Sequence, residues 1–182
     1  AVWAYTNTDD SAWKTVTCPG YVDEQQNELK AFDGFFWLRR TIDIPKEWAG
    51  KELAVCLGCI DDNDITYFNG EEIGQTVGCT LERNYTIPAK LVKAGKSTIA
   101  VRVHDTGGLA GIWNINDDKF VIAPKTGGKP LSIAGELKYK ISVNSGKAPL
   151  MPVNISNDPN EHTVLFNAMI NPIIPYTITS AI

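Results

Sequence analysis

The sequence predicts an all-β protein, a jelly-roll β-sandwich formed by one main domain. Short runs with alternating apolar residues recur along the chain, turn-forming Gly, Pro, Asn and Asp separate them, and helical periodicity is almost absent. Strands at this spacing are typical of sandwiches and jelly rolls. With 182 residues, the chain is long enough to bury one sizeable core.

The aromatic-rich N-terminal part predicts the first strands. The Asp-Asp-Ser run at 9–11 favours a turn, and a strand anchored by Trp13 follows it. Residues 35–44 predict a strong strand. Its outward positions are Arg39, Thr41 and Asp43, and its inward positions are Leu38, Arg40, Ile42 and Ile44. We expect the inner faces of the two sheets to hold the tryptophans.

Residues 53–74 are the stretch around which the chain is organised. An alternating strand begins at Leu53, a second one spans 65–68, and Asn69-Gly70 predicts a tight hairpin turn because these residues tolerate successive positive φ values. The acidic run at 61–64 lies between the two strands. It is too charged to be buried without partners, so we expect the chain to cross between strands on the surface there.

The second half of the chain predicts further strands and one glycine-rich loop. The expected strands span 85–87, 97–103, 120–123, 131–134 and 136–143, with one helical turn over 89–94 that is closed by Gly95. The segment 105–113 differs because it contains Gly107, Gly108 and Gly111. Missing side chains there predict either a tight turn or the close approach of a partner to the backbone.

Charge and hydropathy exclude several classes of partner. The net charge of -4 and a pI near 5.2 argue against nucleic acid and against an anionic membrane surface. No apolar run approaches the roughly 18 residues that span a bilayer. The first residues lack the features of a signal peptide, and the chain begins at Ala1, so we expect a processed product or a piece of a longer protein.

The cysteines and the acidic run raise the question of a metal. In an extended strand Cys56 and Cys59 point to opposite faces, which disfavours a shared zinc ion, and we interpret the four cysteines as small buried hydrophobes. A disulfide bond between two of the four cysteines is an alternative that the sequence leaves open. Calcium at Asp61, Asp62 and Asp64 is an alternative, although the EF-hand pattern is missing. We therefore predict no metal and no cofactor.

Carbohydrate binding is the functional prediction that the residues support. Sugars are recognised by an aromatic face together with charged or amide groups on loops at one end of a sandwich. The residues that could furnish this set are Trp113, Asn114, Arg83, Asp61 and Asp62. The structural alternative is that Trp113 caps the core and that the acidic run solvates a turn. We predict no catalytic residue, because His104 and Asp105 are adjacent in a strand and His162 lies in a linker.

The composition predicts three segments. Residues 1–145 are the jelly-roll domain, the Pro- and Asn-containing segment 146–163 is a linker, and 164–182 is the truncated start of a second domain.

Several separate blocks of the sequence resemble one family. The blocks DDSAWK at 9–14, residues 32–74, residues 85–108 and LFNAMINPIIPY at 165–176 resemble the internal region of bacterial sialate O-acetylesterases of the SGNH-hydrolase class. The resemblance implies a jelly roll, similar to the sugar-binding domain of β-galactosidase-type glycosidases, inserted into a catalytic domain. It also implies that the second domain of this chain has an α/β fold. The Gly-Gln-Ser-Asn-Met block of that family does not occur in this chain.

The resemblance implies an accessory role rather than catalysis. The expected partners are the SGNH catalytic domain of the same parent and a sialylated or acetylated glycan, in a secreted or periplasmic protein. Two alternatives remain open, namely a purely structural insertion that contacts other domains, and an independent lectin-like protein.

Overall fold

The computed structural model describes residues 2–30 and 32–145. Its strands are β1 (Lys14–Cys18), β2 (Gly20–Tyr21), β3 (Gly34–Ile44), β4 (Leu53–Asp61), β5 (Asn63–Phe68), β6 (Glu71–Thr76), β7 (Glu82–Ile87), β8 (Gly95–Asp105), β9 (Gly111–Trp113), β10 (Val121–Pro124), β11 (Leu131–Ser132) and β12 (Gly135–Asn144). Short 3₁₀ turns form at η1 (Val2–Ala4), η2 (Asn27–Leu29), η3 (Lys46–Trp48) and η4 (Ala89–Leu91). Over these described residues, no helix has the length and apolar character that crossing a membrane requires.

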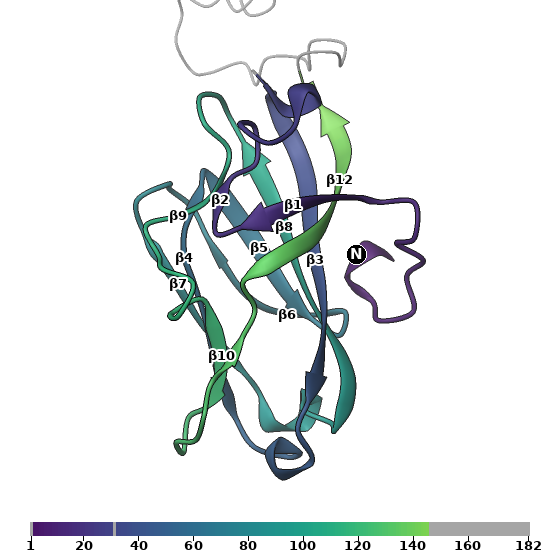
Figure 1. Cartoon of the computed structure of the whole chain (residues 1–182), viewed down its shortest axis with the longest axis vertical. Coiled ribbons are helices and arrows are strands. Elements are labelled where there is room, and N and C mark those ends of the chain that lie inside the picture. Colours follow the sequence, from purple (N-terminus) through teal and green to yellow (C-terminus); the bar gives the residue numbers. More distant parts are fainter. Residues whose placement is uncertain (1, 31, 146–182) are drawn as a thin grey trace, which may run out of the picture. The chain divides into compact units, whose positions relative to one another are not determined.

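The strands form two antiparallel sheets that pack face to face, which confirms the predicted all-β jelly-roll sandwich (Figure 1). Sheet A has the order β1-β12-β3-β8-β5-β6. Sheet B has the order β11-β10-β4-β9-β2, and β7 also pairs with β4. Apart from the β5–β6 and β10–β11 pairs, neighbours in each sheet are far apart in sequence, and β3 lies between β12 and β8 along its length. Such long-range pairing is characteristic of this fold class.

The main core lies between the sheets. It is built from alternate residues of the long strands, including Phe36 and Leu38 of β3, Leu57 of β4 and Val101 and Val103 of β8, all of them almost fully buried. Successive side chains of a strand point to opposite faces, so each strand contributes every second residue to this core. The inward positions predicted for β3 are confirmed, except that Arg40 is only half-buried.

A second apolar cluster covers the outer face of sheet A. Trp37 and Tyr67 lie there with the rings of Trp3 and Trp13, which the N-terminal segment 2–13 brings over the sheet. The expectation that tryptophans fill the inner faces is therefore wrong for these three, while Trp48 does belong to the main core. The N-terminal segment supplies enough apolar surface to make the outer face a second buried layer.

Arg39 shows how completely this segment covers sheet A. The predicted outward position is confirmed, but the side chain is buried. Its guanidinium donates hydrogen bonds to Asp10 and to the backbone carbonyls of Trp3 and Tyr5. The cation therefore holds the covering segment in place, and these three hydrogen bonds offset part of the cost of its burial.

The hairpin at Asn69-Gly70 is confirmed. It joins β5 to β6, and both turn residues have positive φ, 52° for Asn69 and 92° for Gly70. The expected surface crossing at 61–64 is only partly correct, because the chain does pass there from sheet B to sheet A but Asp64 is buried. The ion pair with Arg83, 2.9 Å long, supplies the partner that the prediction did not include.

The predicted linker 146–163, the segment 164–182 and His162 lie outside the described residues. The division of the chain into these segments stays a prediction.

Candidate functional site

The outer face of sheet B carries the candidate site. Ile112 of β9 points into the core, so its neighbour Trp113 points outward. Trp113 pairs with Cys59 of β4, and Cys59 pairs with Glu82 of β7. Two residues earlier in β9, Gly111 pairs with Tyr21 of β2 on one side and with Asp61 of β4 on the other. Four strands, β2, β4, β7 and β9, thus bring two aromatic and two acidic side chains to one face.

Gly58 gives this face its shape. Its φ of 68° interrupts the alternation of β4, and the pairing with β7 shifts register between Cys56 and Cys59. A Cβ atom at this position would lie 2.7 Å from the side chain of Ile115 and from the carbonyl oxygen of Trp113. The missing side chain therefore allows the segment after β9 to rest directly on β4.

The bulge also corrects a prediction about the cysteines. Because Leu57 and Ile60 both point into the core, Cys56 and Cys59 lie on the same outer side of β4 rather than on opposite sides. Cys59 contacts the carbonyl oxygen of Thr80 and the side-chain amide of Asn114, whereas Cys56 is half-buried. All four cysteines are free thiols.

Two adjoining clefts lie on either side of the segment after β9. The first, which we call the amide cleft, has a volume of about 600 Å³ and is lined by Cys56, Gly58, Glu82, Asn114, Ile115, Asn116 and Lys119. The second, the aromatic cleft, has a volume of about 420 Å³ and is lined by Pro19, Gly20, Tyr21, Ile112, Trp113, Ile115, Asn116 and Asp117. Ile115 and Asn116 line both, so the two clefts are parts of one surface.

Backbone geometry fixes the residues between the clefts. Asn114 has a φ of 55°, a left-handed conformation that Asn tolerates better than most residues, and it reverses the chain after β9. The backbone N–H groups of Lys119 and Phe120 both donate to the carbonyl oxygen of Asn116. Phe120 is buried in the main core, which anchors the loop at its far end. The amide side chains are therefore carried by a short, tethered loop.

Trp113 presents carbon rather than nitrogen to the solvent. The residue is half-buried, and its indole Nε1 is fully buried without a hydrogen-bond partner among residues 2–30 and 32–145. Whatever part of the indole remains exposed is therefore carbon, which is the surface that packs against the C–H face of a sugar ring.

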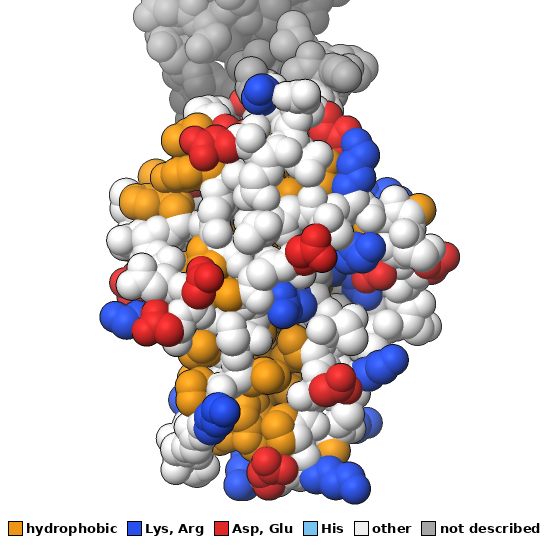
Figure 2. Space-filling view, viewed as in Figure 1, with side chains coloured by type: hydrophobic (Ala, Val, Ile, Leu, Met, Phe, Trp, Pro, Cys, Tyr) orange, Lys and Arg blue, Asp and Glu red, His pale blue; other side chains and the backbone are white. Residues whose placement is uncertain are grey.

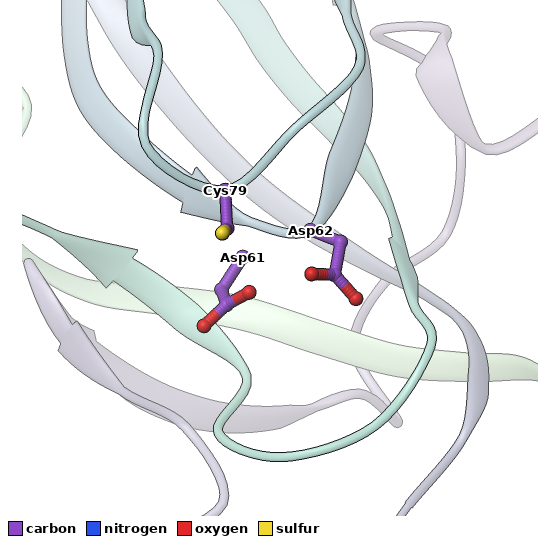
Figure 3. Close-up of side chains that lie close together, drawn as sticks. All are labelled: Asp61, Asp62 and Cys79. Atoms are coloured by element: carbon purple, nitrogen blue, oxygen red, sulfur yellow. The ribbon is translucent and has the colours of Figure 1, made fainter.

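A group of potential metal ligands lies at the end of the same face. Figure 3 shows the carboxylates of Asp61 and Asp62 and the thiol of Cys79 directed toward a common space, and their ligand atoms lie within 4.8 Å of one another. Burial, followed by the hydrogen bond and the charge of Asp62, raises the pKa of Asp61 to about 6. Burial also acts to raise the pKa of Asp62, but hydrogen bonds from Thr106 outweigh it and lower that pKa.

This ligand set differs from the calcium alternative inferred from the sequence. Asp64 is excluded from it because both of its carboxylate oxygens accept hydrogen bonds, Oδ1 from Arg83 and Oδ2 from Thr66, each within 2.9 Å. Cys79 takes its place. Two carboxylates with one thiol match a zinc-like ion better than calcium, which prefers oxygen ligands alone.

Arg83 has a structural role rather than a surface one. Its side chain is fully buried, and it donates to Asp64 and to the backbone carbonyls of Asp62 and Leu81. The hydroxyl of Tyr85 also donates to Asp64. Arg83 therefore joins the two sheets and holds the segments that carry Asp62 and Cys79, and it cannot reach a ligand on the surface.

The sequence argument against a His104–Asp105 catalytic pair agrees with the geometry. His104 lies on the outer face of sheet A, where its ring stacks on Phe35 at a centroid distance of 4.2 Å. Asp105 is buried, and its Oδ1 accepts from the N–H of Gly107. Burial and then the charges of neighbouring carboxylates raise the pKa of Asp105 to about 6. The two side chains therefore point to opposite faces of sheet A.

Three of the five predicted sugar-binding residues, Trp113, Asn114 and Asp61, lie on the outer face of sheet B. Asp62 lies at the crossing to sheet A and binds Thr106, and Arg83 is buried. The sequence analysis missed Tyr21, Glu82, Asn116 and Lys119. Asn116 and Lys119 follow Trp113 closely, so the polar run after that aromatic residue was an available signal, whereas Tyr21 and Glu82 reach the site only through strand pairing.

An apolar cleft at the opposite end of the sandwich is a weaker candidate. Its volume is about 510 Å³, and Pro45, Trp48, Pro124, Pro130 and Leu131 supply its apolar lining. Figure 2 shows apolar side chains gathered beside β10 in this view, with charged side chains scattered over the rest of it. The lining contains no Asn or Gln side chain, so it lacks the amide groups that orient a polar ligand.

No protein-family profile matches the sequence. A curated β-glucuronidase from Formosa agariphila is 23% identical over 116 residues, which are 56% of this chain and 12% of that protein. Among solved structures, a glycosyl hydrolase family 2 member from Bacteroides cellulosilyticus has a TM-score of 0.52 and 22% identity, covering 60% of this chain and 17% of its own. A Bacteroides uniformis β-glucuronidase has a TM-score of 0.49 and 22% identity, covering 75% of this chain and 15% of its own.

The comparison with the family 2 structure shows the fold of the chain and no more. The family 2 structure shares the β-sandwich fold. This chain spans only 12% of the length of the curated relative.

The expected identity as part of an SGNH-class sialate O-acetylesterase is wrong. The curated relative is a β-glucuronidase and the similar solved structure is a family 2 glycosyl hydrolase, and neither is an esterase. The blocks at 32–74 and 85–108 that carried the resemblance form the strands and turns of the sandwich. Residues that specify a sandwich say little about the chemistry of an attached domain. The block at 165–176 lies outside the described residues.

Proposed function

We propose that this chain is a non-catalytic, carbohydrate-binding domain of a larger carbohydrate-active enzyme, and that the outer face of sheet B binds the glycan. The names of the relatives, which are glycosidases, support a glycan as the ligand class. The proposal concerns this domain, because the chain spans a small part of those relatives.

One observation carries the proposal. Trp113 and Tyr21 line a cleft that continues, through Asn116, into a cleft lined by Asn114 and Glu82. Carbohydrate sites combine an apolar ring face with amide and carboxylate groups that hydrogen-bond hydroxyls. Both halves of that combination adjoin on a face that no described segment of the chain covers.

The test is glycan binding by the full chain. We expect an array of neutral and acidic glycans to give specific signals, and isothermal titration with the strongest glycan to give saturable heat. Trp113→Ala should weaken this binding about ten-fold or more, because it removes the apolar platform.

The matched control is Trp3→Ala, which removes a tryptophan from the opposite sheet face. It should lower stability and leave glycan affinity unchanged. If no glycan on the array binds, or if the two variants weaken binding equally, the outer face of sheet B is not a carbohydrate site.

A further inference from the structure

The two clefts supply different chemistry to a ligand that crosses them. The aromatic cleft offers the rings of Tyr21 and Trp113, and the amide cleft offers Asn114, Glu82 and Lys119. Asn116 lies on the shared wall and can hydrogen-bond on either side. A ligand confined to the amide cleft would meet no aromatic ring, and a ligand confined to the aromatic cleft would not meet Asn114, Glu82 or Lys119.

The size of the surface favours a ligand longer than one sugar. The volumes are about 600 and 420 Å³, and each lies within the roughly 300–1,000 Å³ that accommodates a whole drug-sized ligand. Both clefts are open to solvent and share Ile115 and Asn116 in their lining, so a chain of sugars lying across these two residues can reach both clefts.

The charge of the surface favours a neutral ligand. Of the residues that line the two clefts in the described part of the chain, Glu82 and Asp117 are acidic and Lys119 carries the single positive charge. Asp61 adds a further carboxylate one strand away from Trp113. Carboxylate ligands are usually bound by the planar fork of an arginine, and Arg83 is buried against Asp64.

We infer that this face binds a neutral oligosaccharide of at least two units, lying across Asn116 with one unit against Trp113, and that it discriminates against uronic and sialic acids. The inference rests on the proposed function and names its ligand class. Like-charge repulsion from Glu82, Asp117 and Asp61 supplies the discrimination. The names of the glucuronidase relatives alone would suggest the opposite preference.

The experiment uses the full chain and an array of neutral gluco-, galacto-, manno- and xylo-oligosaccharides of one to six units, printed beside uronate- and sialate-terminated counterparts. We expect the strongest signals from neutral glycans of two or more units. For the strongest glycan, titration should give at least a ten-fold gain in affinity from one unit to two or three. Affinity should change less than two-fold between about 0.05 and 0.5 M salt, because no charge pairing contributes.

Two variants test the two halves of the inference. Asn116→Ala should reduce the gain in affinity that the second unit brings, because Asn116 lies where the ligand crosses from one cleft to the other. Glu82→Gln combined with Asp117→Asn should raise affinity for the uronate-terminated counterpart about three-fold or more.

The outcomes separate the inference from the proposed function. Neutral preference with a length-dependent gain supports both. Saturable binding that is strongest for uronates or sialates, or that does not grow beyond one unit, overturns the inference and leaves carbohydrate binding intact. Absence of binding to every glycan overturns both.

Discussion

The outer faces of the two sheets use the same kinds of residue for opposite purposes. On sheet A, Trp37 and Arg39 are buried under the N-terminal segment, and its Trp3 and Trp13 pack on them. On sheet B, Trp113 is half-buried beside open clefts. The comparison teaches that an aromatic residue on an outer strand position predicts function only where no other segment covers it.

The two buried arginines also differ in where they lie and in what they bind. Arg39 binds a partly exposed Asp10 and two carbonyls outside the sheets, whereas Arg83 binds a fully buried Asp64 between them. Neither guanidinium is free for a ligand. The difference in burial of the two carboxylates predicts a difference in what each arginine contributes to stability.

The largest expected effect comes from Arg83→Met. This change leaves Asp64 buried without its cation, and we expect the free energy of unfolding to fall by about 4 kcal/mol. Urea unfolding at pH 7 measures it. Lys125→Met is the control, because its ion pair with Glu52 is about half exposed and should contribute less than about 1 kcal/mol.

A double variant sharpens this prediction. Arg83→Met with Asp64→Leu replaces the ion pair by apolar side chains and should recover part of the lost stability. An equal or larger loss in the double variant would mean that the hydrogen bonds of Thr66 and Tyr85 to Asp64, rather than the uncompensated charge, dominate.

Replacing the two tryptophans separates the roles of the two faces. Trp37→Ala should lower the free energy of unfolding by about 3 kcal/mol, because it opens a cavity under Trp3 and Tyr67. Trp113→Ala should cost about 1–2 kcal/mol, since the ring is only half-buried. Unfolding experiments measure both changes. Equal costs would show that Trp113 caps the core rather than serving as a surface platform.

Arg39→Met should give an intermediate loss of about 2 kcal/mol, because its three hydrogen bonds attach the N-terminal segment to sheet A. The effect should be local. Hydrogen exchange should accelerate at residues 2–13 and stay unchanged in β4 and β9, and faster exchange in those strands would contradict the view that the two outer faces are independent.

The strands and the hairpin were predictable from the sequence because their determinants are local. Alternation marked β3, β8 and β12, and Asn69-Gly70 marked its turn. The buried ion pair between Asp64 and Arg83 was not predictable. The two residues are 19 positions apart in sequence, and they meet only because β5 and β7 lie in opposing sheets. An acidic run therefore suggested a surface loop.

The candidate site was predictable only in part for the same reason. Trp113 and Asn114 stood out by residue type beside the glycine-rich loop. Tyr21 comes to the site through its pairing with Gly111, and Cys56 and Cys59 share a face only because Gly58 inserts a bulge. A prediction of strand faces from alternation assumes an uninterrupted strand. One glycine with positive φ inserts a bulge, and the residues after it then point to the opposite face from the one that alternation predicts.

The smallest expected effect concerns the acidic end of sheet B. The pKa of Asp61 rises from 3.8 to about 6 on folding, so the folded chain holds this proton more tightly than the unfolded chain does. The contribution of this carboxyl to the free energy of unfolding is therefore greatest below about pH 4 and falls as the pH rises to about 6.

Asp61→Asn should raise stability at pH 7 by on the order of 1 kcal/mol, since solvent screens a partly buried carboxyl, and should have little effect at pH 3. Urea unfolding at both values measures this difference. Asp43→Asn, which also replaces one aspartate by asparagine but at an exposed position on sheet A, is the control. A loss of stability in Asp61→Asn at pH 7 would mean that the ionised carboxylate has a favourable partner, and a zinc-like ion held with Asp62 and Cys79 would then be the first to examine.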